Sequence, residues 1–227
     1  MKRKTTNIVW LKRDLRSQDH EPLLKAEAAS IPYRIIYLFE PSMIAYLDTS
    51  LRHLQFVYQS IIALNKTLNQ FNREVDIFYG EAIDVFNYLG EKFDIRNLFS
   101  HRESGTQITW QRDKTITNFC RVNNIRWFES QRDGILRGIK NRTDWNKQWH
   151  ITMHQPVIEN RYSYSNEEKI AHPFPIPDKL EKQLQNYPKE YQPAGEKNAW
   201  RYLVSFATAR GFKYQKHISK PTESRKS

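Results

Sequence analysis

The chain is poor in cysteine and glycine and has no long apolar run. Its single cysteine, Cys120, excludes an internal disulfide framework and any zinc site built from several cysteines, so we expect a reducing, cytoplasmic compartment. No apolar run approaches the roughly 18 residues of a membrane span, and no apolar stretch of a secretory signal follows the basic residues 1–4. The seven glycines form neither a G-x-G-x-x-G fingerprint nor a P-loop, which weakens the dinucleotide and nucleoside-triphosphate interpretations.

Signals of metal binding are also scarce. His150 and His154 stand four residues apart, as zinc ligands on a helix can. The glutamate that would accompany them is missing and no third ligand is apparent, so we expect surface or packing histidines and no metal site. Asp133 and Asp144 lack a spacing that would suit paired acid and base work.

Positive charge dominates and is clustered. The 36 Lys and Arg against 25 Asp and Glu give a formal net charge of +11, of which residues 1–129 carry +3 and residues 130–227 carry +8. Clustered basic residues suit a polyanion such as nucleic acid, but Lys-rich surfaces also serve solubility. The excess lies mainly beyond residue 129, so it is weak support for DNA binding by this chain alone.

Residues 1–129 alternate strand-like and helix-like segments. Short apolar runs predict buried strands, and apolar residues at three- and four-residue spacing predict helices between them. The expected strands are 7–11, 33–39, 75–79, 97–100 and 125–128, and the expected helices are 20–30, 51–71, one around 83–89, and 106–123. Such alternation implies right-handed crossovers, so we expect an α/β fold: a Rossmann-like five-stranded parallel sheet with helices on both faces.

Beyond residue 129 the pattern changes. Six of the ten prolines lie between residues 156 and 193, a density that blocks long helices and central strands. We therefore expect residues 130–194 to form a long Pro-rich connector that wraps the first domain, residues 1–129. Five aromatic residues suggest that it is packed: Trp145, Trp149, Tyr162, Tyr164 and Phe174.

Residues 195–227 are expected to open a second domain. Within them, residues 196–210 have a helical pattern that places Trp200, Leu203, Val204 and Ala207 on one face, and Gly211 fits the C′ position after the helix. Without a docking partner, residues 212–227 have little apolar surface to bury, so we expect them to be mobile.

Three motifs stand at the ends of predicted elements. Residues 9–16 (VWLKRDLR) end the first strand and place Lys12, Asp14 and Arg16 at the carboxyl edge of the sheet, where open α/β sheets bind ligands. There Asp14 can pair with Arg16 or Lys12, either at a binding site or as an ion pair that only stabilises the loop. The second motif joins residues 100–105 (SHRESG) to residues 110–113 (WQRD), with residues 50–53 (SLRH) at the start of the long helix. The third comprises residues 209–214 (ARGFKY), residues 218–221 (ISKP) and Ser224.

In order and spacing, these motifs resemble the photolyase/cryptochrome family. The resemblance implies that Lys12, Asp14, Arg16, Arg52 and Glu103 line the cleft that holds an antenna chromophore. For Arg52 and Glu103 the alternative is a solvated helix end and a structural ion pair. Folate-binding members carry an Asn-Glu pair shortly before the Arg-Asp, where residues 108–109 of this chain are Ile-Thr. A deazaflavin or flavin antenna is therefore favoured over folate, and an empty cleft stays open.

The third motif resembles the opening of the family's helical FAD domain. Tyr214 matches the tyrosine that contacts FAD in the family, the alternative being an ordinary tyrosine at a helix end. The Ser-Arg-Leu-Ser run that holds the FAD phosphates does not appear before Ser227. The resemblance thus implies an N-terminal fragment with an incomplete FAD site and no catalytic residue of its own.

The function implied by the resemblance is that of a DNA photolyase. The full-length protein would use light-excited FAD to split pyrimidine dimers flipped out of damaged DNA, while the fragment alone would be inactive and bind DNA weakly or not at all. Two alternatives remain open at this point. One is a cryptochrome photoreceptor without repair activity, and the other is an unrelated nucleotide-binding α/β domain.

Overall fold

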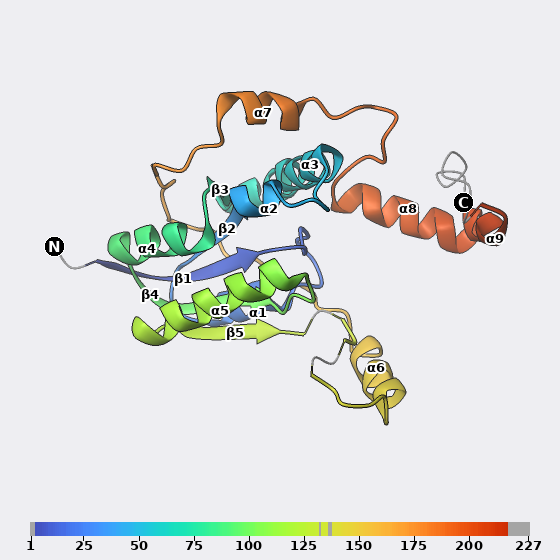
Figure 1. Cartoon of the computed structure of the whole chain (residues 1–227), viewed down its shortest axis with the longest axis horizontal. Coiled ribbons are helices and arrows are strands. Elements are labelled where there is room, and N and C mark those ends of the chain that lie inside the picture. Colours follow the sequence, from blue (N-terminus) through green and yellow to red (C-terminus); the bar gives the residue numbers. More distant parts are fainter. Residues whose placement is uncertain (1–2, 132, 136–137, 218–227) are drawn as a thin grey trace.

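A five-stranded parallel sheet forms the centre of the molecule, in the order β3-β2-β1-β4-β5 (Figure 1). The structure is a computed structural model and describes residues 3–131, 133–135 and 138–217. The strands are β1 (Lys4–Leu11), β2 (Tyr33–Phe39), β3 (Val75–Tyr79), β4 (Phe93–His101) and β5 (Arg126–Ser130). All four strand pairs are parallel, which confirms the predicted Rossmann-like α/β fold.

Helices connect the strands, and two of them begin at a residue whose side chain caps the first turn. The helices of this region are α1 (Glu21–Ala28), α2 (Pro41–Ile44), α3 (Leu51–Leu68), α4 (Ala82–Lys92) and α5 (Gln107–Val122), with a 3-10 turn, η1 (Asn69–Phe71). Helix α3 begins after Ser50, whose side chain accepts a hydrogen bond from the backbone N–H of His53. Helix α1 begins after His20, whose Nδ1 accepts from the backbone N–H of Leu23.

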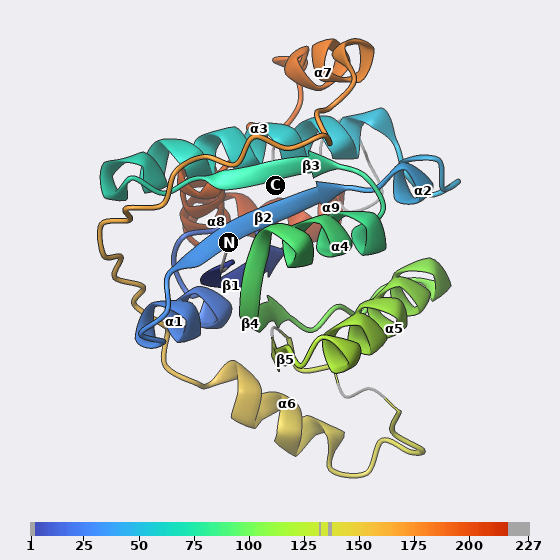
Figure 2. The ribbon, with the colours of Figure 1, turned by 90° about the vertical axis from the view of Figure 1, so that its left-hand side faces the viewer.

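The core consists of two layers, one on each face of the sheet. Successive side chains of a strand point to opposite faces, so Ile8 and Trp10 pack under α4 and α5 while Val9 and Leu11 pack under α1 and α3. Figure 2 shows α4 and α5 on the side of the sheet opposite α1. Both faces of the sheet are therefore covered by helices, as a parallel sheet requires.

The sheet has a topological switch point between β1 and β4. From β1 the chain proceeds through β2 and β3 on one side and then returns to β4 and β5 on the other. The loops after β1 and β4 therefore leave in opposite directions, and in open α/β sheets ligands bind in the crevice this creates. Two of the three sequence motifs, at residues 9–16 and 100–113, meet at this edge.

The chain after β5 crosses the body in an extended path with two short helices, α6 (Trp145–Met153) and α7 (Asp178–Gln185). The segment is tied to the body by backbone hydrogen bonds, from Asp19 to Ile158 and from Tyr79 to Phe174. Tyr162 and Phe174 pack on the core, as expected. The expectation was wrong for Tyr164, which is 68% exposed. Its neighbours Ser163 and Ser165 bond to the body, so the side chain between them turns outward.

The C-terminal part comprises α8 (Glu196–Thr208), a 3-10 turn η2 (Arg210–Lys213) and α9 (Tyr214–His217). The predicted C′ role of Gly211 was wrong, because α8 ends earlier and Gly211 lies inside η2. A Cβ at this position would lie 2.7 Å from the carbonyl oxygen of Phe206, so the close approach of two backbone segments accounts for the glycine. The predicted face of α8 is apolar, with Leu203 and Val204 more than half exposed.

Two expectations concern the ends of the chain. Residues 218–227 lie outside the described residues, and with them the end of the third motif and most of the segment predicted to be mobile. In the described part of the chain, no helix is both long enough and apolar enough to span a bilayer.

Candidate functional site

A cavity of about 1000 Å³ opens at the carboxyl ends of β1 and β2, at the edge predicted from the sequence. Its walls come from the β1–α1 loop, the segment after β2, α3, the start of α5 and the first half of α8. Four of the predicted binding residues line it: Lys12, Asp14, Arg16 and Glu103. The cavity therefore brings the first two sequence motifs together with part of α8.

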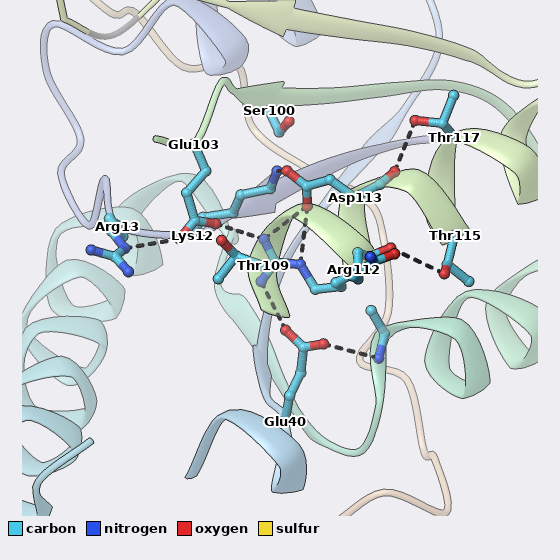
Figure 3. Close-up of polar contacts among 12 residues, drawn as sticks. Lys12, Arg13, Glu40, Ser100, Glu103, Thr109, Arg112, Asp113, Thr115 and Thr117 are labelled. Atoms are coloured by element: carbon cyan, nitrogen blue, oxygen red, sulfur yellow. Dashed lines mark hydrogen bonds and ion pairs between the residues drawn. The ribbon is translucent and has the colours of Figure 1, made fainter. Parts of the chain in front are cut away.

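Arg112 of α5 organises the inner wall (Figure 3). Its Nη1 lies 2.9 Å from Glu40 Oε1, its Nη2 lies 2.6 Å from Glu103 Oε2, and its Nε lies 3.0 Å from Asp113 Oδ1. All three guanidinium nitrogens are thus engaged by carboxylates, and the guanidinium carbon lies 4.7 Å from the centre of the Trp10 ring. Arg112 therefore has a structural role, because each of its three guanidinium nitrogens already binds a carboxylate and none is available to bind a phosphate.

Two further cations of this wall are paired as well. Lys12 Nζ lies 3.0 Å from Asp113 Oδ2 and faces the rings of Trp10 and Trp127 at 4.5 and 5.1 Å. Burial lowers the pKa of Lys12, and Asp113 opposes this effect. Arg13 Nε lies 2.9 Å from Glu103 Oε1 at the exposed rim. The three cations and three carboxylates balance, so the inner wall has no net charge.

The two glutamates of the wall have opposite pKa shifts. Burial raises the pKa of Glu40, although the Arg112 guanidinium opposes the shift. Burial also acts to raise the pKa of Glu103, but there Arg112, Lys12 and Arg13 together lower it below its usual value. Glu40 Oε2 in addition accepts the backbone N–H of Ala82 at 3.3 Å, which joins the end of β2 to the start of α4.

Asp14 has partners other than those expected. Its Oδ2 lies 2.5 Å from His101 Nδ1 and 2.8 Å from His20 Nε2, and its Oδ1 accepts the backbone N–H of Lys12 at 2.8 Å. The expected pairing with the Arg16 or Lys12 side chain was wrong, because Asp14 turns inward under the loop. Burial acts against ionisation, but the two histidines hold the pKa of Asp14 well below its usual value, and burial lowers the pKa of His101. Arg16 instead reaches Asp19, with Nη2 3.3 Å from Oδ2.

Two predicted binding residues lie away from the cavity. The Arg52 guanidinium lies 4.5 Å from the ring centre of Tyr191 and is absent from the cavity lining. On helix α3, Arg52 falls on the stripe that carries Gln55 and Gln59, which bond to the end of α7, while His53 and Val57 face the cavity. Tyr214 is 46% exposed on α9 and meets Phe206 edge-on at 5.8 Å between ring centres.

Sequence reasoning missed Glu40, His20 and the α8 wall. Glu40 directly follows the second predicted strand, so its place at the carboxyl edge could have been recognised from the sequence. His20 carried no signal, because its role depends on a contact with Asp14 across a folded loop. The α8 wall depends on how a helix from the C-terminal part docks, which no local pattern encodes.

Comparison with known proteins agrees with this architecture. The family model described as DNA photolyase matches residues 7–149. The curated protein Cryptochrome-1 of Aedes aegypti is 26% identical over 130 residues, covering 54% of this chain and 24% of that protein. The deoxyribodipyrimidine photo-lyase of Buchnera aphidicola is 24% identical over 224 residues, covering 88% of this chain and 44% of that protein.

Solved structures share the fold at low sequence identity. A cryptochrome of Synechocystis superposes with a TM-score of 0.70 at 17% identity, over 95% of this chain and 49% of that one. An archaeal photolyase of Sulfolobus tokodaii, described with two FAD molecules, gives a TM-score of 0.69 at 17% identity, over 97% of this chain and 56% of that one. The chain thus spans about half the length of these structures, and less than half of the two curated relatives.

Proposed function

This chain belongs to the DNA photolyase family, and from that premise we propose that it forms the antenna-binding α/β part of a flavin-dependent photolyase. The cavity of about 1000 Å³ at the switch point of the sheet carries the proposal. Its size suits a planar chromophore of three fused rings, and its lining unites the motifs at residues 9–16 and 100–113. The proposed division is an antenna domain at 1–129, a connector at 130–194 and the opening of an FAD-binding domain at 195–227.

For the whole protein we propose light-driven repair of pyrimidine dimers in damaged DNA. FAD bound in a helical domain would supply the electron. An antenna chromophore held in the cavity would transfer excitation energy to the FAD. A relative named as a photo-lyase matches over 88% of this chain, which supports this reaction class. Tyr214 would contribute to the FAD site, and the basic residues beyond residue 129 would contact phosphates without reading sequence. A cytoplasmic location is proposed, in keeping with one buried, unpaired cysteine, Cys120.

The proposed antenna is a deazaflavin or flavin rather than a folate. Ile108 and Thr109, which stand where folate-binding members carry Asn-Glu, both line the cavity. A chromophore in this position would meet an apolar side chain and a hydroxyl that already donates to the Thr106 carbonyl at 2.9 Å. The neutral inner wall, whose cations are paired with carboxylates, also favours an uncharged ring system there.

The antenna proposal is tested by titrating the purified chain with 8-hydroxy-5-deazaflavin, FMN and methenyltetrahydrofolate, with chromophore fluorescence as the readout. We expect a 1:1 complex with one of the first two and weaker binding of the folate. The Ile108→Asn, Thr109→Glu double variant should shift the preference toward folate. The surface variant Lys114→Gln, whose ammonium lies over Trp110 at the outside of α5, serves as the control. Tight folate binding by the unaltered chain would contradict the proposal.

Repair is tested with the full-length protein. A dimer-containing oligonucleotide is illuminated with blue light after flavin reduction, and restored thymines are measured. Dimer splitting supports the photolyase, whereas flavin photoreduction without splitting supports a cryptochrome. The cryptochrome alternative is kept because proteins of that name are among the relatives matched.

A nucleotide-binding α/β domain is the third candidate, and the structure gives it little support. Such a site needs a free cation or a glycine-rich turn for phosphate, and the cations of the inner wall are all paired. Stoichiometric FAD bound outside the cavity, at Tyr214, would contradict the proposed division, because it would place a complete FAD site of the helical domain within residues 1–227.

A further inference from the structure

A second group of polar side chains lies beneath the cavity wall, where the β1–α1 loop crosses the end of β4. Asp14, His20 and His101 each offer one ligand-type atom, and these atoms lie within 4.8 Å of one another. The side chains are 1%, 0% and 5% exposed, respectively. The antenna proposal uses neither histidine, so the chemistry of this group is unassigned.

Hydrogen bonding satisfies one of the two imidazoles facing Asp14 but not the other. His101 Nδ1 makes a well-directed contact with Asp14 Oδ2 at 2.5 Å. His20 Nε2 lies 2.8 Å from the same oxygen as an ion-pair contact, but this fully buried nitrogen makes no hydrogen bond. Native proteins rarely leave such an atom without a partner, so a further group is expected at this position.

We propose that Asp14 Oδ2, His20 Nε2 and His101 Nδ1 bind one divalent transition-metal ion of the zinc or cobalt type. Two imidazoles and one carboxylate are a recurrent ligand set for such ions, with a remaining position open to water or another ligand. The set carries one negative charge, that of Asp14, which a buried cation would compensate. Magnesium and calcium are disfavoured, because they prefer a shell of oxygen ligands.

Two of the three ligands are fixed by contacts outside the group. Asp14 Oδ1 is held by the backbone N–H of Lys12 at 2.8 Å. The backbone of His20 is held on both sides by Asn160, whose Oδ1 accepts from His20 N at 2.8 Å and whose Nδ2 donates to His20 O at 2.9 Å. Such anchoring limits the entropy lost when an ion binds.

Binding requires a small and specific rearrangement. Ligands about 2.1 Å from a metal lie roughly 3 Å or more apart, so the contacts of 2.5 and 2.8 Å must widen by several tenths of an ångström. The coordinating nitrogen of each imidazole must carry no proton, so a ring proton has to lie on the other nitrogen. In His20 that other nitrogen is Nδ1, which now accepts from Leu23 N–H at 3.2 Å. Loading therefore breaks the cap bond at the start of α1.

The test is a titration of the chelator-treated chain with Co²⁺ and then Zn²⁺. We expect one ion per chain, visible d–d absorption of protein-bound Co²⁺, and its displacement by Zn²⁺. Hydrogen exchange of the Leu23 amide should accelerate on loading, a readout that adventitious surface binding would not move. Since this readout needs no substitution, it decides the proposal even if a variant fails to fold.

Two variants locate the ion. His20→Asn keeps a side-chain acceptor for the Leu23 N–H but removes a ligand, and should weaken binding by at least roughly tenfold. The control is the double variant His150→Ala, His154→Ala, which removes the exposed pair on α6 whose ring centres lie 5.4 Å apart. The proposal would be overturned if metal binding survived His20→Asn but disappeared in the control, or if the chain bound no metal at all. Asp14, His20 and His101 would then be a group held together by hydrogen bonds only.

Discussion

Glu196 and Ser17 are 179 positions apart in the sequence and are joined by two hydrogen bonds to one carboxylate oxygen. The backbone N–H and the hydroxyl of Ser17 lie 2.7 and 2.6 Å from Glu196 Oε2, and the N–H of Gln18 lies 3.1 Å from Oε1. Helix α8 has no buried residue of its own. Its N-terminal carboxylate is therefore a main attachment of α8 to the β1–α1 loop, and it fixes one wall of the cavity.

Replacing this carboxylate should loosen α8. In Glu196→Ala, two backbone N–H groups and a hydroxyl lose a charged acceptor, which we expect to cost about 1–3 kcal/mol of unfolding free energy. Hydrogen exchange at Ser17 and Gln18 should accelerate, and urea denaturation gives the energy. Glu190→Ala, an exposed glutamate shortly before α8, is the matched control. Unchanged protection of Ser17 and Gln18 would contradict the role given to Glu196.

Arg112 should tolerate no replacement by lysine. A lysine cannot engage Glu40, Glu103 and Asp113 together, so buried carboxylates would lose their partner. We expect Arg112→Lys to lower the free energy of unfolding by about 2–4 kcal/mol and to weaken chromophore binding in the cavity. Arg121→Lys, on the same helix and with a side chain hydrogen-bonded only to Asn118 among the contacts described, should change neither quantity.

Asp76 should make stability depend on pH in the acid range. Burial raises its pKa from 3.8 to about 6, and the Arg34 guanidinium, 3.9 Å away, only partly opposes the shift. Between those values the folded state binds more protons than the unfolded state, so the free energy of unfolding falls as pH rises from about 4 to about 6. Asp76→Asn should remove this loss and stabilise the chain at pH 7.5 by up to about 3 kcal/mol.

Urea denaturation at pH 4.5 and 7.5 measures the effect of Asp76. The two proteins should differ little at the lower pH and clearly at the higher one. Asp84→Asn on the exposed side of α4 is the control and should show no such pH-dependent gain. A variant that is less stable than the parent at pH 7.5 would show that Arg34 outweighs burial.

Gly195 should be irreplaceable by alanine for two separable reasons. Its φ is +96°, which disfavours any residue with a Cβ, and a Cβ there would lie 2.6 Å from that of Ala63. Gly138 also has a positive φ, of +72°, but its Cβ would meet nothing within 4 Å. Gly195→Ala should therefore cost more than Gly138→Ala in urea denaturation. Ala63→Gly in the Gly195→Ala background should recover only the part due to the clash.

The sequence predicts the sheet well because its strands are encoded locally. Runs such as residues 33–39 and 75–79 are apolar except for one charged residue each, Arg34 and Asp76, and their observed limits match the predicted ones. Strand β4 begins at Phe93, four residues before its predicted start, because the polar positions there pair with the extended start of β1. Such pairing is a tertiary effect that local patterns do not contain.

The polar partners at the site could be predicted only in part. Placing Lys12, Asp14 and Glu103 at one edge follows from the parallel topology. Which cation pairs with which carboxylate does not, since Asp14 meets His101 from a strand 87 positions away. Arg52 illustrates a second limit of prediction from sequence. Neighbouring residues of α3 face different ways: His53 faces the cavity, whereas Arg52 lies on the side of the helix that faces α7.

At the switch point, the residues that form the core are largely different from those that line the cavity, and this separation has an evolutionary consequence. The core is built from strand residues and from the buried faces of the helices, whereas most of the residues that meet the cavity follow the ends of β1, β2 and β4. Substitutions in these three segments, outside the buried ion pairs, can therefore exchange one bound pigment for another while the core is left intact. Directed evolution toward a new absorbing colour should accordingly collect its mutations at lining residues such as Tyr46, Thr49 and Ile108 and leave the strands and the ion pairs of Arg112 unchanged.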